Sequence, residues 1–116
     1  MFAKFSDLST EVKSQVRGGA GDVRFRHLLT KEQLGGRADL FALLTLEPGN
    51  GVGEHPHVGN GEAYVIVSGC ATVTEDGVAR VMHPGDVEFC ADGHTHAIHN
   101  HTDEPVTFLA LIVGDC

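Results

Sequence analysis

The chain has 116 residues, 41% of them hydrophobic, which suits one domain with one core. Its 16 acidic and 8 basic residues give a formal charge of -8, and this charge repels phosphate backbones and anionic lipid headgroups. We therefore expect neither nucleic acid nor a membrane as a partner. The thin basic cluster of Arg17, Arg24 and Arg26 is expected on a solvated strand face.

The sequence also predicts a cytoplasmic location. No apolar run approaches the ~20 residues needed to cross a bilayer, and residues 1–15 lack the apolar core of a secretory signal. The three cysteines, Cys70, Cys90 and Cys116, are an odd number at wide spacing, which argues against a disulfide framework. A disulfide bridge between Cys70 and Cys90 is left as an alternative.

In chain order, residues 1–21 are expected to form a lead-in arm, helical or irregular over 6–16 and then rich in glycine. From Val23 onward, short apolar runs alternate with turn residues, as is typical of an all-β sandwich or barrel. We expect the barrel domain over residues 22–116. Its strands are predicted at 22–29, 38–47, 51–57, 62–68, 70–75, 78–83, 86–90, 95–100 and 105–113. Asp76-Gly77 is a two-residue hairpin signal, because both positions tolerate positive φ.

Two predicted strands are apolar on both faces, within residues 39–46 and 106–113. Val106, Phe108 and Ala110 alternate with the equally apolar Leu109 and Leu111. A barrel strand normally has one face inside and one in water. A second copy of the chain would cover the outer face, so we expect a homodimer.

Seven of the eight histidines fall between residues 55 and 101. His55 and His57 are two apart, so on an extended strand both imidazoles point to the same side. A short turn follows, and Glu62 on the next strand can return a carboxylate to the same pocket. About thirty residues later a glycine turn precedes His96, which can close the site from the opposite wall.

These two segments resemble the cupins. The first segment fits the whole of the family's first motif, from Gly49 through His55-x-His57 and Glu62 to Gly69. The second motif is matched by four residues, with Ala91 where proline is usual; the matching residues are Gly85, Gly93, His96 and Asn100. The departure concerns a turn and not a ligand.

The resemblance implies a jelly-roll barrel, the double-stranded β-helix of small single-domain bacterial cupins. It also implies that His55, His57, Glu62 and His96 hold one metal ion. Three imidazoles and one carboxylate suit iron, manganese, nickel, copper, cobalt or zinc and leave positions for water or substrate, whereas calcium and magnesium prefer oxygen. The alternative is a barrel that keeps the turn glycines and binds no metal.

Two further side chains are candidates for proton transfer. Tyr64 has the strand parity of Glu62 and can present its hydroxyl to the cavity, the alternative being a packed core tyrosine. His94 has the parity of His96 and can lie at the pocket mouth, the alternative being a solvated turn residue.

The expected function is that of a metal-dependent enzyme acting on a small oxygen-rich or carbonyl substrate, of oxygenase, isomerase or lyase type. The alternative is a module that captures a small molecule or metal without turnover, because the chain has little beyond the barrel to build lids. The two differ in whether a bound compound is converted.

Overall fold

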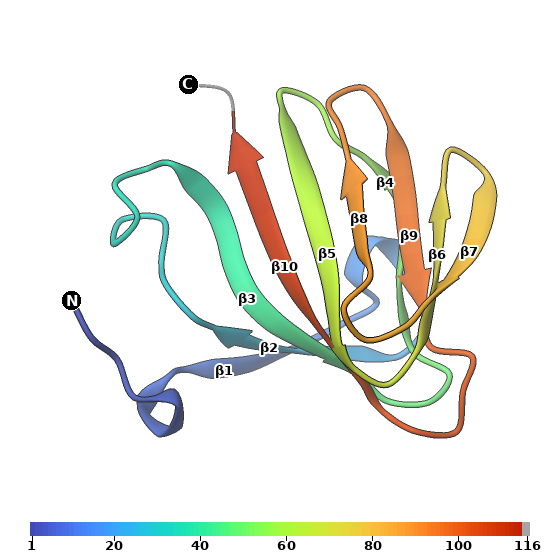
Figure 1. Cartoon of the computed structure of the whole chain (residues 1–116), viewed down its shortest axis with the longest axis horizontal. Coiled ribbons are helices and arrows are strands. Elements are labelled where there is room, and N and C mark those ends of the chain that lie inside the picture. Colours follow the sequence, from blue (N-terminus) through green and yellow to red (C-terminus); the bar gives the residue numbers. More distant parts are fainter. Residues whose placement is uncertain (115–116) are drawn as a thin grey trace.

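The computed structural model describes residues 1–114, so Cys116 lies outside the described part. Within it, ten strands and two short 3-10 helices, η1 (Phe5–Asp7) and η2 (Val16–Gly18), form an all-β jelly roll (Figure 1). The strands are β1 (Thr10–Ser14), β2 (Asp22–His27), β3 (Ala38–Leu46), β4 (Gly51–Pro56), β5 (Asn60–Ser68), β6 (Ala71–Glu75), β7 (Val78–Met82), β8 (Val87–Cys90), β9 (Thr95–His99) and β10 (Val106–Gly114).

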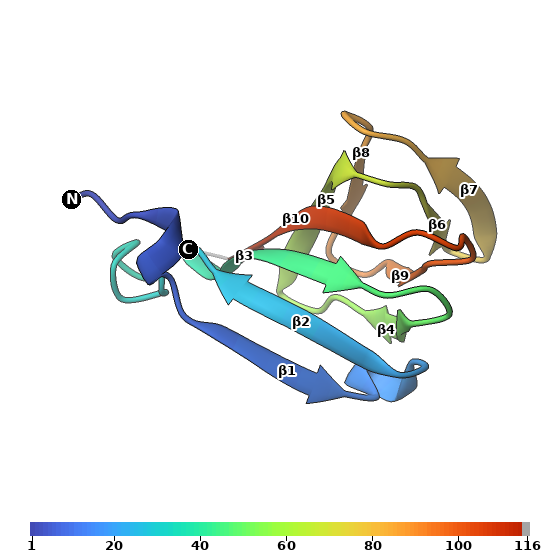
Figure 2. The ribbon, with the colours of Figure 1, turned by 90° about the horizontal axis from the view of Figure 1, so that it is seen from below.

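The strands form two antiparallel sheets that face each other. One has six strands in the order β1-β2-β3-β10-β5-β8, and the other has four in the order β4-β9-β6-β7. Figure 2 shows the larger sheet curving from β1 at one edge, through β10, to β8, with β4 and β9 beneath it. The inner faces bury a core that includes Tyr64, Ile66, Ile98 and Phe108. The predicted all-β class is confirmed.

Alternating apolar residues explain the long strands. In β10, Val106, Phe108 and Ala110 are completely buried, whereas Leu109 and Leu111 on the opposite parity stay partly exposed. Side chains of one parity point to one face of a strand, so this face enters the core. The outer face is apolar as well, as the sequence indicated.

Turn chemistry sets the strand boundaries. Asp76 and Gly77 have φ of 49° and 81° and connect β6 to β7, as the Asp-Gly signal predicted. Gly69 has a φ of 79°, and a Cβ there would lie 2.5 Å from the carbonyl oxygen of Pro105. Asn100 is fully buried and donates from Nδ2 to the carbonyls of Leu46 (3.0 Å) and Glu104 (2.8 Å), which ties down the approach to β10.

The prediction of helical or irregular structure for residues 6–16 holds for the end of η1 and was wrong over residues 10–14. The structure has a strand there, β1, which pairs with β2 along its whole length, from Thr10 opposite Arg26 to Ser14 opposite Asp22. All five residues of β1 are exposed, so no alternation of buried side chains marks this edge strand in the sequence. Its pairing comes from backbone hydrogen bonds to β2.

The segment between β1 and β2 lies against β4. An added Cβ on Gly53 would be 2.1 Å from the carbonyl oxygen of Arg17, and one on Gly19 would be 2.3 Å from that of Gly51. The amide of Gly51 also donates to Ala20 at 2.9 Å. Only glycines permit such an approach of two backbones, and it places η2 beside β4, the strand that carries the predicted ligand His55.

Cys70 and Cys90 are both free thiols, so the possible bridge between them is absent. Burial, with smaller contributions from Glu88 and Glu75, raises the pKa of the Cys90 thiol to about 12. Cys90 is therefore an unreactive core residue. Within residues 1–114, every helix is too short to cross a membrane.

Candidate metal centre

Four side chains from three strands and one loop meet between the two sheets. His55 on β4 lies directly opposite His96 on β9, and Glu62 comes from the facing sheet on β5. His57 follows β4 and is held by backbone bonds, its amide donating to the carbonyl of His94 at 3.0 Å. All four residues are at most 5% exposed.

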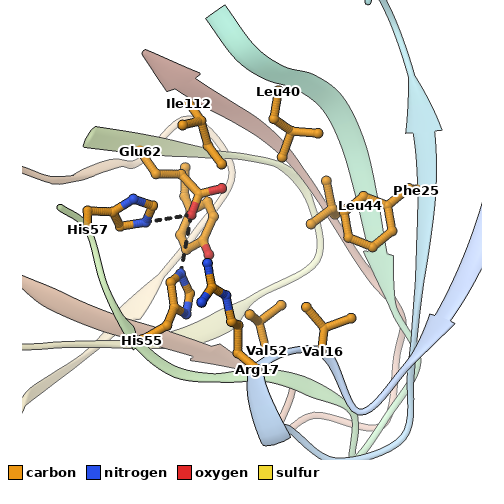
Figure 3. Close-up of a pocket in the computed structure, with 11 residues that line it drawn as sticks. Val16, Arg17, Phe25, Leu40, Leu44, Val52, His55, His57, Glu62 and Ile112 are labelled. Carbon is orange, nitrogen blue, oxygen red and sulfur yellow. Dashed lines mark hydrogen bonds and ion pairs between the residues drawn. The ribbon is translucent and has the colours of Figure 1, made fainter. Parts of the chain in front are cut away.

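The donor atoms converge on one carboxylate oxygen. Oε1 of Glu62 lies 3.0 Å from Nε2 of His96, 3.2 Å from Nε2 of His57 and 3.5 Å from Nε2 of His55. The Nε2 atoms of His57 and His96 are 3.1 Å apart, and all four donors lie within 4.8 Å of one another. Figure 3 shows His55 and His57 both directed at Glu62.

The other ring nitrogen of each imidazole faces an acceptor. Nδ1 of His55 is 2.7 Å from the carbonyl of Gly53, and Nδ1 of His57 is 2.8 Å from Oδ1 of Asn60. Nδ1 of His96 is 3.0 Å from Oε1 of Glu88. A neutral ring therefore keeps its proton on Nδ1, which leaves the Nε2 lone pair for a metal ion at the centre.

This donor set fits a divalent metal ion. Three inward lone pairs and a carboxylate repel one another unless a cation lies between them. Neighbouring donors at ~2.1 Å from one ion are about 3.0–3.4 Å apart, close to the spacing found here. The chemistry of the four donors suits a transition metal, as the sequence indicated.

In the metal-free protein, one imidazole of this cluster binds an additional proton. Burial alone would raise the pKa of Glu62, but its contacts with His55 and His96 lower it to about 2. For His96, burial alone would lower the pKa, yet hydrogen bonds to Glu62 and Glu88 raise it to about 9. The metal-free cluster therefore holds a charged His96 between two carboxylates at neutral pH.

A cavity of about 150 Å³ opens beside three of the predicted ligands, His55, His57 and Glu62. Its remaining lining consists of Arg17, Tyr64 and six apolar side chains: Val16, Phe25, Leu40, Leu44, Val52 and Ile112. Figure 3 shows the apolar group on one side of the cavity and the ligands on the other. The volume is smaller than the ~300–1,000 Å³ of sites for drug-sized ligands.

Tyr64 lines this cavity, and its ring stacks on His96 with centroids 4.6 Å apart and planes at 5°. It is 1% exposed. Burial, followed by the charges of Glu62 and Glu88, raises its pKa well above the ordinary value. The hydroxyl therefore stays protonated at neutral pH and can donate a hydrogen bond or a proton, but it is not a base.

His94 lies apart from the cavity lining. Its side chain is 52% exposed, and Nδ1 is 2.5 Å from Oδ2 of Asp76. Thus the structure brings together the four predicted ligands and Tyr64, while the imidazole of His94 points to Asp76. A catalytic role for Tyr64 or His94 stays a prediction.

Two residues beside the site were not identified from the sequence. Glu88 contacts a predicted ligand from β8, and its strand parity with Cys90 could have placed it on the inner face. Arg17 was expected on a solvated strand face with Arg24 and Arg26. It is exposed, as expected, but it belongs to η2 and lines the cavity. Arg17 is far from the predicted ligands in the sequence, so no local sequence pattern indicated that it lies near them.

The family model of the cupin domain, Cupin_2, matches residues 42–112. The chain belongs to the cupin family. This cupin is 38% identical over 113 residues to a protein of Thermotoga maritima named oxalate-binding protein, and the match covers 97% of this chain and 93% of the relative. The resemblance stated from the two motifs is thereby confirmed.

Solved structures agree with the fold of this cupin. A Thermotoga maritima crystal structure, described as a predicted oxalate decarboxylase, has a TM-score of 0.94 and 38% identity, covering 98% of this chain and 99% of that one. A cupin-superfamily sugar phosphate isomerase from Silicibacter pomeroyi has a TM-score of 0.80 at 22% identity, covering 97% and 75%. The second likeness shows the fold alone.

Proposed function

We propose that this cupin is a metal-dependent enzyme acting on a small oxygen-rich or carbonyl substrate, of oxygenase, isomerase or lyase type. The observation that carries the proposal is the convergence of His55, His57, Glu62 and His96 beside a cavity of about 150 Å³. The bound ion, which is iron, manganese, nickel, zinc, cobalt or copper, would supply Lewis acidity or a centre for dioxygen chemistry.

The Thermotoga maritima relatives narrow the proposed substrate. One is named for binding oxalate and the other is described as a predicted oxalate decarboxylase. Oxalate is small and rich in oxygen, so it suits both the volume of the cavity and a metal that accepts oxygen ligands. We propose small carboxylates of this kind as the first compounds to test.

The residues of the chain have separate roles in this proposal. The imidazoles and Glu62 hold the ion, and the apolar wall excludes water, which strengthens electrostatic interactions inside the cavity. Tyr64 holds a proton beside the reacting group. The case for His94 is weaker, because its exposed imidazole would have to leave Asp76 to reach a substrate.

Metal content and turnover test the proposal. Protein expressed without an affinity tag should contain about one ion per chain, and His57→Ala should lose it, whereas the exposed His83→Ala should keep it. The loaded protein should convert a small carboxylate or carbonyl compound from a panel that includes oxalate, with or without oxygen uptake. Tyr64→Phe should lower kcat more than His94→Ala. An ion ratio well below one would overturn the assignment.

The second candidate is a non-catalytic binding or sensing module. The observation in its favour is that the 38% identical relative is named for binding and not for a reaction. The same panel separates the two candidates, since a sensor binds oxalate or a related compound tightly and leaves it unchanged. Conversion by the wild type that is lost in His57→Ala would exclude this candidate.

We also propose that the chain forms a homodimer through the outer face of the larger sheet. Two rows of side chains cross four strands in register there: Phe41, Leu111, Ala63 and Phe89, and Leu43, Leu109, Val65 and Val87. Phe89 and Val87 are 51% and 65% exposed. A continuous apolar face of this kind favours self-association.

The free thiols Cys70 and Cys90 fit the cytoplasm, which we propose as the location.

A further inference from the structure

Arg17 is the only permanently charged cation among the residues that line the cavity. It comes from η2, outside the strands that carry the metal ligands. Figure 3 shows its side chain extending past Val52 toward His55. The ion pairs of the described residues do not include Arg17, so its guanidinium is available to a ligand.

The backbone holds Arg17 in an unusual conformation. Its φ and ψ are 53° and 32°, in the left-handed region that residues with a Cβ rarely adopt. The amide of Gly18 donates to Gln15 at 2.9 Å, and Gln15 is itself left-handed with a φ of 52°. Such backbone is kept only where the surrounding structure requires it, and it is concentrated at ligand sites.

Gly53 joins Arg17 to the metal centre. A Cβ at Gly53 would lie 2.1 Å from the carbonyl oxygen of Arg17, and the carbonyl of Gly53 accepts the bond from Nδ1 of His55 at 2.7 Å. One glycine thus contacts both the arginine backbone and a ligand. The backbone position of Arg17 relative to His55 is therefore set by packing, and its exposed side chain reaches the cavity from there.

The charges of the site require a second cation for a dianion. Glu62 contributes a negative charge at the donor cluster, and the whole chain carries a formal charge of -8. A bound metal can attract one carboxylate of a small dicarboxylate, but the other carboxylate would enter an apolar cavity unpaired. A guanidinium presents two parallel N–H donors that match a carboxylate.

We propose that Arg17 binds the second carboxylate of a small dicarboxylate whose first carboxylate is held at the metal centre, and thereby sets the specificity of the cavity for dianions. This inference rests on the proposed function. It names a specificity residue that the cupin motifs do not contain.

Equilibrium binding to metal-loaded protein tests the inference with two probes, oxalate and oxamate, which differ in one end being a carboxylate or a neutral amide. We expect the wild type to bind oxalate more tightly than oxamate. Arg17→Gln should weaken oxalate binding roughly 10- to 100-fold and change oxamate binding less than about threefold, because a charged hydrogen-bond pair is lost only with oxalate. Arg17→Lys should recover part of the loss, since it keeps the charge but lacks the two-pronged geometry.

Two controls separate this inference from the proposed function. Arg24→Gln, on the exposed outer side of β2, should leave both affinities unchanged. Chelator competition should give the same metal affinity for Arg17→Gln and wild type. If Arg17→Gln lost affinity for oxalate and oxamate equally, or lost affinity for neither, the proposed role of Arg17 would be overturned. The proposed metal site would not be affected by either result. Failure of the loaded wild type to bind either probe would overturn the substrate class and the inference together.

Discussion

Glu88 accepts a hydrogen bond from Nδ1 of His96 at 3.0 Å, from the side of the imidazole opposite the donor cluster. The second oxygen of the same carboxylate lies 3.2 Å from that nitrogen. A carboxylate in this place fixes the ring orientation and makes Nε2 a more basic ligand. We therefore predict that Glu88 is a positioning residue, which would act on the proposed metal through His96.

Glu88→Gln should weaken metal binding by about tenfold or more, since the amide can still accept the hydrogen bond but no longer carries charge. Chelator competition measures the change. Glu54→Gln is the matched control, because Glu54 is exposed on β4 next to a ligand. Equal affinities of Glu88→Gln and wild type would contradict this role of Glu88.

Metal binding should release about one proton at pH 7, because His96 has a pKa of about 9 without metal and must lose its Nε2 proton to bind. Titration calorimetry in buffers of different ionisation enthalpy measures the number. Affinity should rise with pH between 7 and 9, by up to tenfold per pH unit, and level off above this range. Binding without proton release at pH 7 would show that His96 is already neutral.

The same group predicts how the stability of metal-free protein depends on pH. The His96 pKa is raised from 6.5 to about 9, so its contribution is complete below pH 6.5 and is lost as pH rises through 9. Chelated protein should therefore have a lower Tm at pH 9.5 than at pH 6.5. His96→Gln should reduce this pH dependence, and an equal dependence in both proteins would assign it to other groups.

Gly53→Ala should destabilise the protein by about 1–3 kcal/mol, because the added methyl group meets the backbone of Arg17 and η2 must move. Urea unfolding measures the change. Gly114→Ala is the control, since its Cβ meets only the Asp39 side chain at 3.3 Å and should cost less than about 0.5 kcal/mol. Similar losses of stability in Gly53→Ala and Gly114→Ala would mean that η2 can move away from β4 at little cost in free energy.

Leu109→Asp should convert a dimer into monomers, because it places a charge in the centre of the apolar outer face. Analytical ultracentrifugation measures the mass. Val81→Asp is the matched control, since Val81 is 59% exposed on β7, in the other sheet. A wild type that sediments as a monomer would exclude the proposed dimer.

Local spacing in the sequence predicted most of the fold, and the resemblance to the cupin motifs added the four proposed ligands. The separation of His55 and His57 places both imidazoles on one side of an extended chain, and the Asp-Gly pair predicts its hairpin. Both are properties of a few adjacent residues. The strand β1 was missed because none of its side chains is buried, so the pairing that defines it leaves no pattern.

The amino-acid sequence by itself determined most of the strands, the turns and the residue types of the candidate metal centre, because strand parity and turn preferences depend on neighbours along the chain. Only the tertiary structure decided which side chains surround that centre. Glu88 reaches His96 through the packing of the two sheets, and Arg17 reaches the cavity because glycines let η2 approach β4. Contacts between segments distant in sequence depend on how the sheets close, which no local pattern contains.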